Sequence, residues 1–277
     1  MIVTRAVRWL LRIGTGLTLA FLYSPLVIIA IYAFNSTRVQ TWPPKSLTFS
    51  WFSKALHNTG AADALVTSLK VGCAAMALAL VLGSLAAYAI SRFEFFGRES
   101  ISFLLVLPIA LPGIVTGMAL NASFTQVLGV GLSLFTVIVG HATFCVVVVF
   151  NNVAARLRRT PVSFEEAAAD LGATGPRAFV DITFPQMRSA LIAGALLAFA
   201  LSFDEVIVTT FTIGGEQTLP IWILNNLSRP RNLPEVNVVA LVVIVLSIIP
   251  VWIAQRLSSD PLAPGDILRE KTIGPAD

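Results

Sequence analysis

The chain has 277 residues, of which 56% are hydrophobic and only 12% are charged, and its mean hydropathy is +0.82. Soluble domains carry about 25% charged residues, so the composition argues against a soluble globular protein and indicates a membrane protein of about six helices. The net charge of +4 does not indicate a nucleic-acid partner, because the basic residues flank apolar segments instead of forming one face or one run.

Six apolar segments follow one another along the chain, and each is long enough to cross a hydrocarbon core of about 30 Å. In a membrane the backbone must be hydrogen bonded internally, so segments of this kind are expected to be helices. The sequence therefore predicts an all-α membrane protein with six transmembrane helices at residues 13–34, 65–90, 101–124, 132–150, 190–212 and 236–254.

The arrangement of basic residues predicts the orientation of these segments. About two thirds of the 19 lysines and arginines fall at the termini and in the second and fourth connections. Because Lys and Arg are enriched in cytoplasmic loops, we expect both termini in the cytoplasm. The expected organisation is a cytoplasmic N-terminus at 1–12, a six-helix transmembrane domain at 13–254 and a cytoplasmic tail at 255–277. Within that domain, residues 35–64 form an outer loop and residues 151–189 an inner loop.

The inner loop contains a short helix signal. Pro161 precedes it, Ser163 is a candidate N-cap with Glu166 completing a capping box, and Glu165 lies in the first turn, where acidic residues are favoured. Gly172 is placed to end the helix in a left-handed conformation. An amphipathic surface loop would account for this pattern as well as a docking site for another protein would.

The spacing within this loop resembles the EAA signature of permeases of ATP-binding-cassette (ABC) importers. The matching residues are Glu166, Ala167, Ala168, Gly172, Ile182, Phe184 and Pro185. The family pattern ends in Leu-Pro, and Phe184 replaces the leucine here with another apolar side chain. The resemblance implies that the helix around Glu165, Glu166, Ala167, Ala168 and Gly172 couples the membrane domain to an ATPase subunit.

The resemblance extends over roughly residues 20 to 256 and is to the second permease subunit of the spermidine/putrescine importer group. It is carried by Tyr23-Ser24-Pro25, Phe34-Asn35-Ser36, His141 to Cys145, Ala198 to Glu205 and Pro234 to Asn237. It implies a type I (MetI-like) importer fold in the bacterial inner membrane. It also implies a homologous second permease, two ATPase subunits and a substrate-binding protein as partners. No lysine follows a glycine, so a phosphate-binding Gly-Lys loop is absent and a partner must hydrolyse ATP.

Asp204 and Glu205 form the acidic pair embedded in an apolar segment. Carboxylates at membrane depth are costly and usually face a bundle interior or water. One interpretation is that they attract a cationic substrate to the translocation pathway, with Asp204 the stronger candidate. The other is structural, in which they cap a broken helix or pair with Arg229 or Arg231.

Three further features of the apolar segments are predicted with less specific roles. His141 is expected to bond to a neighbouring helix, with a proton relay as the alternative. Pro108 and Pro112 interrupt the third segment, either to allow bending or as fixed packing features. Cys73 and Cys145 are expected to be packing residues, and no spacing typical of a metal site or cofactor is present.

The sequence thus predicts a permease subunit that is not itself an enzyme and that moves a polyamine or a similar small cation inward. An ion-coupled secondary transporter is the first alternative, although it gives the EAA spacing no purpose. An ABC importer for a different solute is the second. Neither a His-Glu-x-x-His nor a Gly-x-Ser-x-Gly arrangement occurs, which argues against an intramembrane enzyme.

Overall fold

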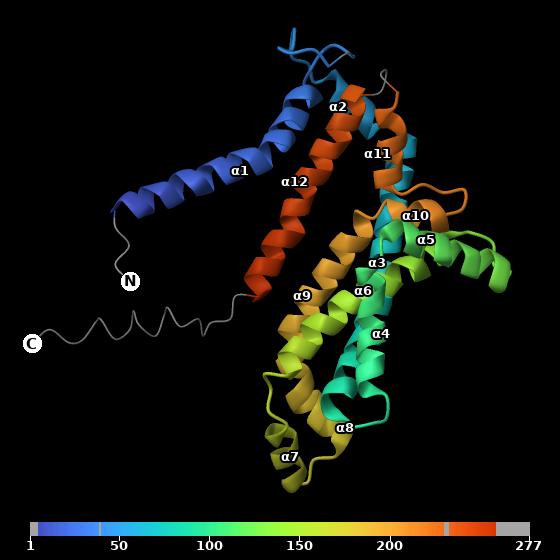
Figure 1. Ribbon diagram of the computed structural model, residues 1–277. Coiled ribbons are helices and arrows are strands. Elements are labelled where there is room, and N and C mark those ends of the chain that lie inside the picture. The colour runs from blue at the N-terminus through green and yellow to red at the C-terminus, as the bar shows by residue number, and fades with distance from the viewer. Residues whose placement is uncertain (1–4, 39, 230–232, 259–277) are drawn as a thin grey trace, which may run out of the picture. The chain divides into compact units, whose positions relative to one another are not determined.

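The computed structural model describes residues 5–38, 40–229 and 233–258, and these residues are mostly helical. Outside the helices they contain one isolated antiparallel bridge, between Asn35 and Leu47. The elements in chain order (Figure 1) are α1 (Arg5–Ala33), α2 (Ser50–Leu56), α3 (Thr59–Arg92), α4 (Arg98–Ala110), α5 (Gly113–Ala122), η1 (Ser123–Val127), α6 (Leu134–Leu157), α7 (Ser163–Asp170), α8 (Gly175–Ala178), η2 (Phe179–Thr183), α9 (Phe184–Phe203), α10 (Ile207–Thr212), α11 (Leu219–Leu227) and α12 (Leu233–Ser258).

Four helical stretches of the described chain are long and apolar enough to cross a membrane. They are Arg5–Ala33, Thr59–Arg92, Leu134–Leu157 and Gly175–Phe203. They correspond to the first, second, fourth and fifth predicted segments. A bent pair raises the number to five if it forms one span, and the apolar helix Leu233–Ile248 is shorter. The helical class is therefore confirmed, whereas the count of six spans stays a prediction.

Two of the predicted segments are interrupted. In the third, the helix α4 and the following helical stretch Gly113–Val127 are bent by 107° relative to each other. The break falls at Leu111, whose extended backbone is what a following proline favours, and at Pro112. In the fifth, α9 ends at Phe203 and α10 begins at Ile207, so one continuous helix over residues 190–212 was a wrong expectation.

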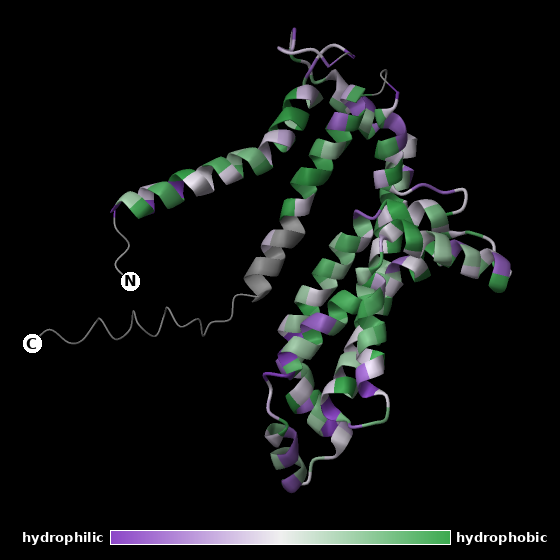
Figure 2. Ribbon diagram, viewed as in Figure 1, coloured by the Kyte–Doolittle hydropathy of each residue, from purple (hydrophilic) through white to green (hydrophobic). Residues whose placement is uncertain are grey.

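The fifth segment also begins earlier than predicted. The helix runs from Gly175 through the π-helical turn η2 into α9, whereas the sequence predicted a span starting at residue 190. The hydropathy pattern located the apolar part of the helix but not its polar start. Figure 2 shows polar residues gathered around α7 and the neighbouring helix ends, whereas α6 and α9 are predominantly apolar.

The described chain divides into two compact units. The first contains the N-terminal part up to Ala64 together with Ile221–Ile248. Its small core consists of Ala33, Trp51 and Val238, and the Trp51 indole donates a hydrogen bond of 2.9 Å to the Asn35 carbonyl. The predicted outer loop therefore holds a helix, α2, with a buried tryptophan. Most of the predicted tail, residues 259–277, and residues 1–4 lie outside the described residues, as does Arg231.

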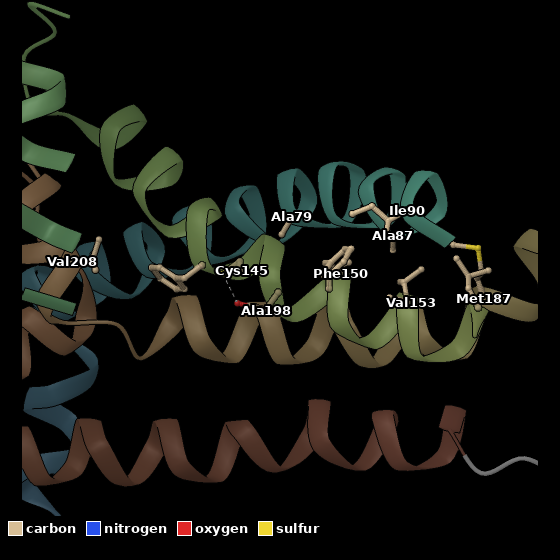
Figure 3. Packing of buried hydrophobic residues seen from close by; sticks show 13 residues of the cluster. Ala79, Ala87, Ile90, Cys145, Phe150, Val153, Met187, Ala198 and Val208 are labelled. Carbon is tan, nitrogen blue, oxygen red and sulfur yellow. Dashed lines mark hydrogen bonds between the residues drawn. The ribbon is translucent and has the colours of Figure 1, made fainter. Parts of the chain in front are cut away.

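The second unit contains Leu65–Pro220 and the remainder of α12. Its core lies where α6 packs along α9 and against α3, and the buried residues of α6 dominate it. Figure 3 shows Cys145 between these helices, with its thiol 3.3 Å from the Ala198 carbonyl oxygen, as expected for a packing cysteine. Met187 and Val208 belong to the same cluster.

Small residues bring these helices into close contact. A Cβ atom on Gly83 of α3 would lie 2.8 Å from the Val146 carbonyl oxygen, and one on Gly194 of α9 would lie 3.3 Å from the Val149 Cα atom. Both glycines therefore face the backbone of α6. Close approach at small residues replaces the hydrophobic driving force that is missing between helices in lipid.

Candidate functional site

The predicted docking helix is present as α7, between the ends of α6 and α8 (Figure 1). Its start differs from the prediction, because Ser163 is the first helical residue and no side chain caps the N-terminus. The backbone amides of Glu165 and Glu166 instead bond to the Val162 carbonyl, at 2.8 and 3.1 Å. The predicted capping box is therefore wrong, since the turn that begins at Pro161 provides the acceptors.

The end of α7 agrees with the prediction. Gly172 has a φ angle of +85°, in the left-handed region that favours glycine. Its amide bonds to the Ala169 carbonyl and the next amide, of Ala173, bonds to the Ala168 carbonyl, both at 2.9 Å. This pair of bonds is the Schellman arrangement. No heavy atom lies within 4 Å of a Cβ built on Gly172, so the backbone conformation alone requires the glycine.

Glu165 attaches α7 to the rest of the second unit. One of its carboxylate oxygens lies 2.8 Å from Nε of Arg92, the last residue of α3, and accepts a hydrogen bond of 2.8 Å from the Thr183 hydroxyl of η2. The Arg92 and Glu165 side chains are only 6% and 18% exposed. Arg92 also donates to the Thr160 carbonyl just before α7. These contacts link the loop to α3 and to the start of the fifth segment.

The five predicted coupling residues divide between two faces of α7. Ala168 is buried and Glu165 is the attachment point just described, whereas Glu166, Ala167 and Gly172 are exposed. We call Phe164, Ala167 and Leu171 (the residue that directly follows the helix) the outer face of α7, because their spacing of three and four residues places them on one side. Phe164 is 52% and Leu171 90% exposed.

Sequence reasoning missed Phe164 and Leu171 in this helix, although the helical spacing of apolar residues was a usable signal. It also missed Arg92 and Thr183. Nothing in the sequence pairs these two residues with Glu165, because the three come from different helices.

The acidic pair lies at the break between α9 and α10. Asp204 is exposed, and the described part of the chain provides no hydrogen-bond or ion-pair partner for its carboxylate. Glu205 is half-buried, and its Oε1 atom accepts a hydrogen bond of 2.9 Å from the Val208 amide. The structural interpretation, in which an acid caps a broken helix, is therefore correct for Glu205. The described residues show no ion pair with Arg229, and Arg231 lies outside them.

His141 is completely buried and hydrogen bonded on both ring nitrogens. Nδ1 lies 2.7 Å from the Ser202 hydroxyl of α9, and Nε2 lies 2.8 Å from the Thr209 hydroxyl of α10. The prediction that His141 bonds a neighbouring helix is confirmed. Asn121 of α5 similarly donates a hydrogen bond of 2.6 Å to the Phe211 carbonyl.

Residues 79–260 match the family described as the binding-protein-dependent transport system inner membrane component. The chain belongs to this family. The matched part of the permease covers α6, the candidate loop around α7 and the broken helix α9–α10.

Two named relatives are similar to most of the permease. It is 34% identical over 232 residues to the putrescine transport system permease protein PotI of Escherichia coli, with 81% of this chain and 82% of the relative covered. It is 32% identical over 241 residues to the spermidine/putrescine transport system permease protein PotC of Haemophilus influenzae, with 86% and 92% covered. The relatives are permease proteins and not enzymes. This chain is likewise a permease protein and not an enzyme.

Solved structures confirm the fold class at lower identity. A bacterial ABC transporter that imports alginate matches with a TM-score of 0.72 and 18% identity, covering 92% of this chain and 99% of that one. The MetNI methionine ABC transporter matches with a TM-score of 0.58 and 15% identity, covering 72% and 93%. The permease therefore has the fold of ABC importer permeases.

Proposed function

We propose that this permease is the membrane-spanning subunit of an ABC importer that moves putrescine, spermidine or a similar small organic cation into the cell. The observation that carries the proposal is the 34% identity to a putrescine permease over 81% of the chain. An exposed acidic side chain at a helix break, Asp204, gives a cationic substrate a chemically suitable contact.

The working complex contains a homologous second permease, two ATPase subunits and an extracytoplasmic substrate-binding protein. The outer face of α7 is the surface that the ATPase covers. Support comes from the exposed apolar side chains of Phe164 and Leu171, since apolar residues clustered on one exposed helix face mark a contact site. Glu166, Ala167 and Gly172 border the contact, and Ala168 lets α7 lie close to its own chain.

ATPase closure is transmitted through the attachment of α7. A displacement of α7 pulls on Glu165, and through it on Arg92 of α3 and Thr183 of η2. Because η2 continues directly into α9, the motion reaches the helix that ends at Phe203, just before Asp204. The coupling helix α7 thus contacts the start of the helical stretch Gly175–Phe203, and Asp204 follows the end of that stretch.

The pathway and topology complete the proposal. Asp204 faces the pathway between the two permeases, and Glu205 serves it indirectly by capping α10. The chain crosses the inner membrane six times, counting α4–α5 and α12 as spans, with both termini cytoplasmic. The permease domain is 13–254, with the outer loop at 35–64, the coupling loop at 151–189 and the tail at 255–277.

Uptake of radiolabelled putrescine and spermidine tests the proposal. Cells lacking this chain, with the partner subunits present, should lose energy-dependent uptake and regain it on complementation. Unchanged polyamine uptake would reject the substrate and favour an importer for another solute. Uptake that persists without an ATPase and follows an ion gradient would instead support a secondary transporter.

The docking role has its own test within the same assay. Leu171→Asp places a charge on the most exposed apolar residue of the outer face and should block co-purification of the ATPase. Val180→Asp, at a 59% exposed apolar residue of η2 outside that face, is the matched control and should retain the ATPase. Equal retention in the two variants would refute the docking surface.

A further inference from the structure

The break between α9 and α10 has no local backbone cause. Sharp helix breaks usually occur at proline, at glycine or where a side chain inserts into the hydrogen-bond ladder. Residues 198–212 contain neither proline nor glycine, in contrast to the α4–α5 break, which contains Pro112. Interactions of side chains must therefore hold this break in place.

Two of these interactions are local. The Glu205 side chain accepts the Val208 amide at 2.9 Å, and the Thr209 hydroxyl donates to the Glu205 carbonyl at 2.6 Å. They replace backbone bonds that a continuous helix would make. Both lie on the α10 side, so they satisfy the start of α10 but do not fix it relative to α9.

His141 supplies the connection between the two sides. Among the described residues it is the one whose side chain is hydrogen bonded both before the break, at Ser202, and after it, at Thr209. It projects from α6, which packs against α9 and α10. A buried imidazole bonded in this way fixes both helix ends to one rigid helix.

The directions of these hydrogen bonds follow from counting protons. The Thr209 hydroxyl has one proton and donates it to the Glu205 carbonyl, so it accepts from Nε2–H of His141. A neutral imidazole with Nε2 protonated has Nδ1 as an acceptor, which takes the Ser202 proton. All three side chains are then satisfied in one chain of bonds that runs from α9 to α10, and such chains strengthen cooperatively.

We propose that His141 is a positioning residue that holds the break open so that the Asp204 carboxylate is presented to the cationic substrate. The proposal rests on the proposed pathway role of Asp204. In a continuous helix, the Asp204 and Glu205 side chains would point about 100° apart, and the protein would have to accommodate two carboxylates that face different directions. The break removes that conflict: Glu205 turns back to cap α10, and Asp204 alone remains exposed.

A double-mutant cycle in the assembled importer tests this assignment. His141→Leu removes both bonds and should lower the ratio of maximal uptake rate to half-saturation concentration at least tenfold per assembled complex. In an Asp204→Asn background the same substitution should lower it by less than twofold further, because its effect passes through Asp204. An equal loss in both backgrounds would show a merely structural role and overturn the proposal.

Variants that keep part of the hydrogen-bond network around His141 test the proposal even if His141→Leu fails to fold. His141→Gln places its amide near the Nε2 position, retaining the bond to Thr209 but not the one to Ser202, and Ser202→Ala removes the same bond from the other side. Both should reproduce most of the His141→Leu loss. Cys145→Ala, on the same helix and also against α9, is the control and should retain uptake within twofold. Wild-type uptake in both His141→Gln and Ser202→Ala would overturn the proposal.

Chemical labelling separates this proposal from the pathway role of Asp204. In protein carrying Cys73→Ser and Cys145→Ala, an Asp204→Cys variant is treated with a charged, membrane-impermeant maleimide. Adding His141→Gln should change the labelling rate at least fivefold, because residue 204 moves when the bridge is lost. If Asp204→Asn transports normally, the pathway role fails, yet the labelling rate still reports on the bridge. An unchanged rate overturns the positioning role.

Discussion

Replacing Glu165 with alanine is the sharpest test of how the coupling loop is attached. The substitution leaves the Arg92 guanidinium, only 6% exposed, without its carboxylate partner, and the Thr183 hydroxyl without its acceptor. Removing one partner of a buried ion pair costs about 3–5 kcal/mol. The neighbouring Glu166, which is exposed, carries the same charge without these contacts.

The expected consequence is local detachment of α7, because the lost contacts join it to α3 and η2. A loss of about 3 kcal/mol lowers the ratio of attached to detached loop by more than a hundredfold. Amide hydrogen exchange in α7 should accelerate accordingly, while the core of α6 remains protected. Uptake per ATP hydrolysed should fall, since ATPase closure no longer reaches α9.

Two variants calibrate the measurement. Thr183→Val removes a single hydrogen bond to the Glu165 carboxylate and should cost about 1.5–3 kcal/mol, an intermediate effect. Asp181→Ala breaks the exposed Arg177–Asp181 pair, whose side chains are 77% and 60% exposed, and should leave exchange unchanged. Exchange in Glu165→Ala that matches Asp181→Ala would refute the argument that the buried pair holds the loop.

Three other substitutions have direct expectations. Gly83→Ala places a Cβ 2.8 Å from a carbonyl oxygen of α6 and should destabilise the helix packing by about 1–3 kcal/mol. The loss should appear as a lower thermal midpoint of unfolding. Gly14→Ala, whose Cβ meets nothing within 4 Å, is the control and should leave the midpoint unchanged. Gly172→Ala should cost about 1–2 kcal/mol through backbone strain at its positive φ; Gly172→Asp should abolish uptake with the protein still in the membrane, and normal uptake would contradict the docking role. Asp204→Asn should lower the apparent affinity for putrescine at least tenfold, and wild-type affinity and rate would remove it from the pathway.

Sequence alone was sufficient where one local rule determined the outcome. A run of apolar residues long enough to cross a membrane located α1, α3 and α6 because lipid requires internal backbone hydrogen bonds. The turn after α7 required glycine, and Gly172 has the expected left-handed conformation. Pro108 and Pro112 were both predicted to interrupt the third segment. The break falls at Pro112, whereas Pro108 lies inside α4, and the 107° bend was not predictable from either residue.

Local rules failed where two signals competed. Ser163 and Glu166 match the capping-box pattern, but Pro161 starts the turn earlier and Val162 supplies the acceptor. Residues 190–212 have the hydropathy of a continuous span, yet the helix breaks between Phe203 and Ile207 without proline or glycine. In both places the chain satisfied its backbone groups in a way that hydropathy and spacing do not encode.

What the sequence determined by itself is therefore the membrane class, the family and the position of the short helix α7 in the inner loop, because composition, hydropathy and motif spacing are local properties. Only the tertiary structure divided the site residues by role. It paired the half-buried Glu165 with Arg92, left Glu166 exposed, turned Glu205 into a cap and left Asp204 exposed. Glu165 and Glu166 differ because the partners of Glu165 come from helices distant in the chain. Asp204 and Glu205 differ because the helix break lets Glu205 accept the Val208 amide.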